Sequence, residues 1–95
     1  MYTPVEMDKV RNFRFGMKAI SFIENKFNKP LKKVDFENLT MEETATVILA
    51  GLIHEDKELT EEKVMEIIDE KGNLEEVLEA MGKAMEQMGG KSSKN

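Results

Sequence analysis

The sequence predicts a mainly α fold, in which a short N-terminal extended segment is followed by a small four-helix domain. Phe13 and Phe15 alternate with polar residues, which is typical of a strand with one buried face. After Gly16 the apolar residues change to helical spacing. Helix-capping residues then precede three further amphipathic stretches, so four helices are expected in total.

The first elements are expected to lie between residues 10 and 27. Val10–Phe15 is predicted to be a short strand, although the sequence shows no evident hairpin partner for it. A first helix is predicted over residues 17–27, and it has to end before Pro30, since proline disfavours helix in the preceding residue. The residues expected on its buried face are Met17, Ile20, Ile23 and Phe27.

Each later helix has its own start. Thr40 and Glu43 form a capping box for a second helix that ends at about Ile53, with Met41, Ala45, Ile48, Leu49 and Leu52 expected to be buried. Thr60 caps a third helix, which Gly72 ends. Asn73 opens a fourth helix that continues to Gly89-Gly90.

Length and composition indicate a single domain over residues 10–90, with a flexible segment over residues 1–9 and a disordered tail over residues 91–95. A chain of 95 residues supports one small core. Because the chain has no cysteine, disulfides, thiolate zinc sites and thiol catalysis are excluded. The longest apolar run, Val47–Ile53, is too short to cross a bilayer, so a cytoplasmic protein with no membrane partner is expected.

The net charge of −5 is distributed unevenly. Residues 1–36 carry eight basic and four acidic residues, whereas residues 37–90 carry four basic and fifteen acidic residues. Our first interpretation of this asymmetry is that the charged residues lie on ordinary solvated helix faces. Head-to-tail association of a basic end with an acidic end is the second interpretation. A nucleic-acid partner is not expected for an acidic chain, because phosphate contacts dominate that affinity.

The sequence offers no catalytic or metal site, and no cofactor is expected. His54 is the only histidine, and the stretch around Glu55 and Asp56 lacks the spacing of a zinc or calcium motif, so a solvated loop is predicted there. Gly89-Gly90-Lys91-Ser92 resembles the end of a phosphate loop, but it follows a helix and lacks the upstream glycine.

The fourth helix carries a heptad seam on one face, formed by Leu74, Leu78, Met81, Met85 and Met88. Methionine side chains are flexible, so such a face adapts to partners of varied shape. Our hypothesis is that this seam binds a client protein or a second copy of the chain. The competing interpretation is that the seam is buried core.

The order of the motifs resembles the small tail-assembly chaperones of long-tailed bacteriophages and related gene-transfer particles. The resemblance covers roughly residues 10–70 and rests on two blocks: Phe13-Arg14-Phe15-Gly16-Met17 leading to Ile20, and Ala50-Gly51-Leu52-Ile53-His54 followed by a charged loop and a capped helix. The motif residues that it assigns to the fold are Phe13, Phe15, Gly16, Ile20 and Leu52.

The resemblance implies a binding function without catalysis. Such proteins coat the long helical tape-measure protein and keep it soluble until tail-tube subunits displace them. The implied partners are therefore the tape-measure protein, a tail-tube subunit and further copies of the chain. Two other classes stay open: a small structural virion component, such as a connector or tail subunit, and a small regulatory DNA-binding protein.

Overall fold

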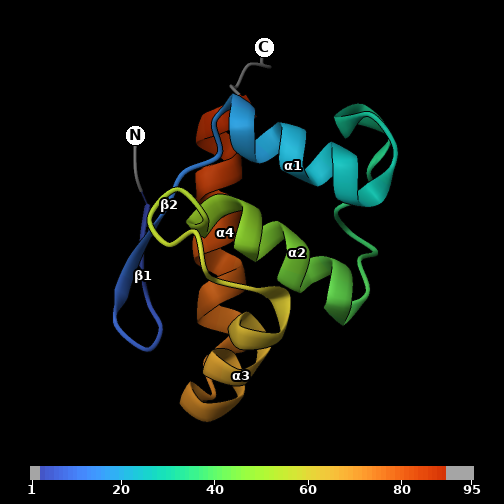
Figure 1. Ribbon diagram of the computed structural model, residues 1–95. Helices are drawn as coiled ribbons and strands as arrows, with labels where there is room; N and C mark the ends of the chain where they lie inside the picture. The colour runs from blue at the N-terminus through green and yellow to red at the C-terminus, as the bar shows by residue number, and fades with distance from the viewer. Residues whose placement is uncertain (1–2, 90–95) are drawn as a thin grey trace.

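The computed structural model describes residues 3–89, and its side chains through residue 86. It has the expected mainly α architecture, with an extended N-terminal part and four α-helices (Figure 1). In chain order, the elements are β1 (Thr3–Glu6), β2 (Val10–Phe13), α1 (Met17–Phe27), a 3₁₀ turn (Leu31–Lys33), α2 (Met41–Leu52), α3 (Glu61–Lys71) and α4 (Leu74–Gly89).

Residues 3–13 form a β-hairpin, so the expectation of a flexible segment over residues 1–9 is wrong for residues 3–9, while residues 1 and 2 lie outside the described residues. Strand β1 pairs antiparallel with β2 in a register from Thr3 opposite Phe13 to Glu6 opposite Val10. Val5 and Met7 are 4% and 2% exposed, so this segment contributes to the core. Strand β1 was not predicted from the sequence, because proline and charged residues surround these two apolar residues. The expected tail over residues 91–95 lies outside the described residues.

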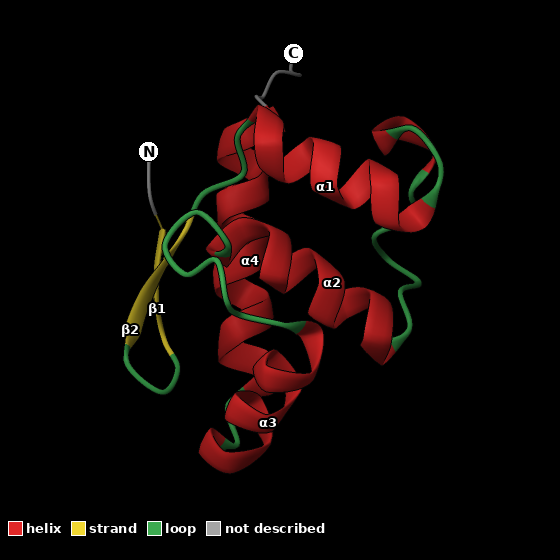
Figure 2. Ribbon diagram, in the orientation of Figure 1, coloured by secondary structure: helices red, strands yellow, loops and turns green. Residues whose placement is uncertain are grey.

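Helix α2 is the central element of the fold. Every residue from Thr44 to Leu52 is buried, and α2 packs against α1, α3 and β2. Figure 2 shows α2 passing between α1 and α3, with the hairpin beside its C-terminal end. A helix buried on nearly all sides takes most of its stability from packing and little from its own propensity.

The expected helix boundaries are confirmed by their caps. Thr40 Oγ1 accepts the backbone N–H of Glu43 at 3.0 Å, and Glu43 Oε1 accepts the backbone N–H of Thr40 at 2.9 Å, which completes the capping box. Thr60 Oγ1 accepts the backbone N–H of Lys63 at 3.1 Å. Helix α3 ends at Gly72, whose φ of 69° is a left-handed conformation that glycine adopts easily.

Two methionines assigned to buried helix faces are exposed instead. Met17 is 88% exposed and Met41 is 58% exposed. Each is the first residue of its helix. In α1 the buried residues are Ala19 and Ile23, so the buried face is rotated away from Met17.

The strand-to-helix segment packs directly on the backbone of α2 at Gly51. The rings of Phe13 and Phe15 are stacked, with centroids 5.7 Å apart and planes inclined by 17°. The Arg14 backbone N–H donates to the Gly51 carbonyl at 2.9 Å. A Cβ at Gly51 would lie 2.6 Å from Phe15 Cζ and 2.7 Å from Phe13 Cδ1. The aromatic pair therefore occupies the volume that any side chain at this position would need.

We predict that Gly51→Ala lowers the free energy of unfolding by about 1–3 kcal/mol, because two buried rings have to move to accept the methyl group. Urea denaturation followed by circular dichroism measures this change. Gly82→Ala is the matched control: a Cβ there meets nothing within 4 Å, and Gly82 lies inside α4. That control should raise stability by about 0.5–1 kcal/mol through helix propensity. Equal stability of the wild type and Gly51→Ala would show that the rings have free space.

Candidate functional site

The predicted seam on α4 lies mostly against the rest of the molecule. Met81 is 9% exposed and, with Val77 and Ala84, belongs to the main core cluster. Leu74, Leu78 and Met85 are partly buried and pack against this cluster. The side chain of Met88 lies outside the described residues. The structure therefore favours the core interpretation for Leu74 through Met85.

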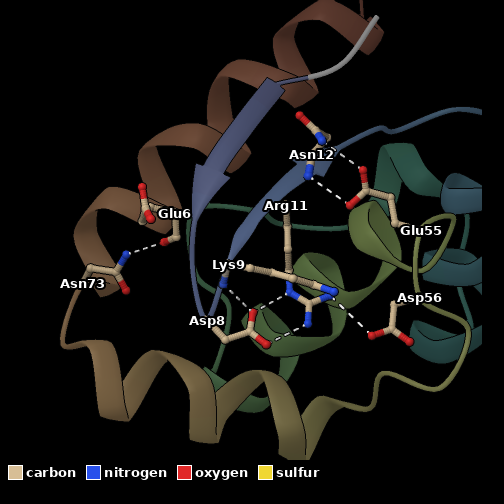
Figure 3. A network of polar contacts seen from close by, with 8 residues as sticks. All are labelled: Glu6, Asp8, Lys9, Arg11, Asn12, Glu55, Asp56 and Asn73. Carbon is tan, nitrogen blue, oxygen red and sulfur yellow. Dashed lines mark hydrogen bonds and ion pairs between the residues drawn. The ribbon is translucent and has the colours of Figure 1, made fainter.

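The hairpin explains why this face is covered. Helix α4 packs against β1 and β2, and the hairpin residues Val5 and Met7 belong to the same cluster as Met81. Asn73 Nδ2, at the start of α4, donates to the Glu6 carbonyl at 2.7 Å (Figure 3). Once residues 3–9 are treated as structured, the seam has an internal partner.

The residues that carry the family resemblance meet in one unit. Phe13, Phe15 and Leu52 are buried in the core, and Ile20 is half-buried on α1. Gly16 is the N-cap of α1, and its carbonyl accepts the Ile20 backbone N–H at 3.0 Å. The first sequence block thus lies on Gly51 of the second block.

The loop after α2 binds the strand β2, although it was predicted to be merely solvated. His54 Nε2 lies 2.8 Å from the Asn12 carbonyl oxygen. Glu55 accepts both the backbone N–H of Asn12 at 3.2 Å and its side-chain amide at 3.0 Å (Figure 3). The loop therefore covers polar groups on β2 that would otherwise be open to pairing. Among the described residues, no three His, Asp or Glu side chains are grouped so that they could hold a metal ion.

A buried arginine joins the same loop to the hairpin turn. Arg11 is 4% exposed and makes a bidentate contact with Asp8, with Nε–Oδ1 at 2.8 Å and Nη2–Oδ2 at 3.0 Å. Its Nη1 also lies 3.4 Å from Asp56 Oδ2 (Figure 3). Sequence reasoning missed this site because Asp56 is 45 residues away along the chain.

These contacts shift the pKa values of Asp8, Arg11 and Glu55. The hydrogen bond from the Arg11 guanidinium lowers the pKa of Asp8, and the same contact raises the pKa of Arg11. For Glu55, partial desolvation works to raise the pKa, but the hydrogen bonds from Asn12 and the charges of His54 and Arg11 outweigh it, so the net pKa is lowered. The carboxylates of Asp8 and Glu55 are thus stabilised in their charged form.

An open groove lies between the first turn of α1 and the C-terminal end of α2. We call it the α1/α2 groove; its volume is about 690 Å³. Its apolar lining includes the exposed Met17, and none of the described residues that line it is acidic. The lining residues are Arg14, Gly16, Met17, Lys18, Ala19, Ala50, Ile53, His54 and Lys57. This groove was not predicted, because it combines two segments that are distant in sequence. The one signal for it in the sequence is the cluster of basic residues around Gly16.

A second hollow of about 140 Å³ lies between α2, α3 and the start of α4. Met41, which is 58% exposed, lines it together with Met65, Ile68 and the acidic Asp69. This volume is a fifth of that of the α1/α2 groove. A third hollow, of about 600 Å³, lies at the starts of α2 and α3 and is lined mostly by polar and acidic residues, with Met65 as its one apolar residue. The α1/α2 groove has the more apolar lining of the two large hollows and is therefore the main candidate for an interaction surface.

No family model, curated protein or solved structure matches this chain. Across residues 3–89, the helices lack the length and apolar character needed to span a membrane.

We predict that Met81→Ala lowers the free energy of unfolding by about 2–4 kcal/mol, because it opens a cavity under the hairpin. Met17→Ala removes the same side chain from an exposed position and should change stability by less than about 0.5 kcal/mol. Thermal and urea unfolding of the two variants measure the difference. A small effect at Met81 would mean that the seam is not core and would restore it as a binding surface.

The Arg11 site predicts a pH-dependent contribution to stability. Arg11→Met should cost about 1–2 kcal/mol near neutral pH, because the charge-assisted hydrogen bonds to partly hydrated carboxylates are lost. The folded-state pKa of Asp8 is lowered, so its contribution is present above the ordinary value of about 3.9 and is lost as the pH falls through the folded pKa. The stability gap between the wild type and Arg11→Met should therefore narrow below about pH 4. Lys9→Met, in the same turn, is the control, and a gap that stays constant with pH would contradict the assignment.

Proposed function

We propose that this protein is a phage tail-assembly chaperone, which binds the tape-measure protein and keeps it soluble in the host cytoplasm until the tail tube forms. The proposal requires no catalysis and no cofactor. The observation that carries it is the joining of the two resembling blocks. Phe13 and Phe15 pack on Gly51, and the Arg14 N–H bonds to the Gly51 carbonyl. Residues that carry the resemblance in the sequence are thus parts of one structural unit.

The shape and charge of the molecule support a holding function. A long helical client presents repeated apolar stripes, and a small acidic binder adds charge and thereby solubility to the complex. Methionine at an exposed position adapts to varied apolar side chains, and Met17 is 88% exposed. Displacement by tube subunits requires modest affinity at each site, which an open groove provides more easily than an enclosed pocket.

The proposal is tested by co-expression with a candidate tape-measure protein, chosen as a long, predominantly helical sequence encoded close to the gene for this chain. We expect the soluble fraction of the tape-measure protein to rise several-fold when this chain is present, and the two proteins to co-purify. Co-expression with an unrelated acidic protein of similar size provides the negative control.

A tape-measure protein that stays insoluble with the folded chain present would contradict the proposal. Recovery of the chain as a fixed component of purified tails would assign it to the structural class instead. A salt-dependent shift of duplex DNA would favour the regulatory class.

A further inference from the structure

We propose that the α1/α2 groove is the client-binding surface and that it takes an amphipathic helix whose apolar stripe is flanked by Asp or Glu. This inference rests on the proposed function, and it replaces the α4 seam as the place of contact. It identifies the partner segment by its chemistry: apolar residues for the floor of the groove and carboxylates for its rim.

The apolar part of the argument begins with Met17. At 88% exposed, it is the most exposed of the large apolar side chains among the described residues. Ala19, Ala50 and Ile53 continue the apolar surface beside it. Burial of Met17 against a partner would remove its apolar surface from water and so contribute to binding.

The charges around the groove indicate that a partner should carry negative charge. The chain as a whole has a net charge of −5, yet Lys18 and Lys57 are both exposed at this groove, and the residues that line it include no acid. The first turn of α1 has no acidic residue, and Gly16 at its N-cap has no side chain to satisfy the free amides. The positive end of the helix dipole therefore adds to the two lysines. Carboxylates on the partner complement this potential.

The backbone around the groove favours a helical partner over an extended one. An extended peptide binds by pairing with a free strand edge. Here the Asn12 backbone N–H is bonded to Glu55, the Asn12 carbonyl to His54 and the Arg14 N–H to Gly51. A helix satisfies its own backbone and needs only side-chain contacts, and one face of it suits an open hollow of about 690 Å³.

The test uses overlapping 30-residue peptides that tile the tape-measure protein, with binding measured by fluorescence anisotropy. We expect binding by peptides with acid-flanked apolar stripes, and a loss of affinity as the salt concentration rises. Met17→Asp should weaken binding at least tenfold, and so should Lys18→Glu combined with Lys57→Glu. Neither change should lower the melting temperature, because all three residues are exposed and an acid in the first turn of α1 suits the helix dipole.

Met41→Asp is the matched control. It places the same charge on the first residue of α2, outside the groove, and should leave peptide affinity within twofold of wild type. A peptide in which the acidic residues are replaced by lysine should bind the doubly reversed variant more tightly than it binds the wild type.

Each failure has a distinct form. If the wild type captures the tape-measure protein and Met17→Asp captures it equally well, the groove assignment is wrong and the proposed function stands. If the wild type binds no tape-measure segment, both proposals fail. A third outcome is that the wild type binds no peptide but self-associates with rising concentration, and that Met17→Asp abolishes this self-association. The groove would then bind a second copy of the chain, and its assignment to a client would be wrong.

Discussion

The close approach of two phenylalanine rings to the backbone of Gly51 is the contact on which the remaining structure depends. Two aromatic rings can come this close to the backbone of a helix only at a position that has no side chain. This contact places β2 beside the end of α2 and brings the Arg14 amide to the Gly51 carbonyl. Val5 lies on the same face of the hairpin as Phe13, and α4 packs against the hairpin as well.

Polar contacts from the loop after α2 further stabilise the hairpin that the aromatic contact places beside α2. A small hairpin on its own is marginal in water, and its open edges invite pairing with other chains. In this protein the loop after α2 stabilises the hairpin and covers part of its edge through three consecutive residues. His54 and Glu55 bind Asn12, and Asp56 binds the buried Arg11. The same loop leaves Lys57 at the rim of the α1/α2 groove. One short segment therefore closes the strand edge and also shapes the exposed surface.

The helices were predictable because their ends have local chemistry. Thr40, Thr60 and Gly72 act within one turn of the chain, so their effect is visible in a short stretch of sequence. Strand β1 was missed because Val5 and Met7 stand among proline and charged residues, and only tertiary contact with α4 makes them core. In α1, the burial of Ile23 was predicted correctly, but that of Met17 was not. Met17 fits the helical period, yet it is the first residue of the helix and is exposed, whereas Ala19 is buried. The basic residues around Gly16 are visible in the sequence, but the groove itself could not be predicted, since it exists only after α1 and α2 have packed together.

The docking of the first strand on the last helix has a consequence for how the chain is made. The hydrogen bond between Asn73 and Glu6 joins residues 67 positions apart, and the buried hairpin residues share their cluster with α4. During synthesis, the N-terminal hairpin leaves the ribosome long before the helix that covers it. Contacts of such large sequence separation are slow to form, because the loop they close costs entropy before it is repaid. The native core is therefore completed only after α4 has been synthesised, and a nascent chain that lacks α4 exposes the apolar side of its own hairpin.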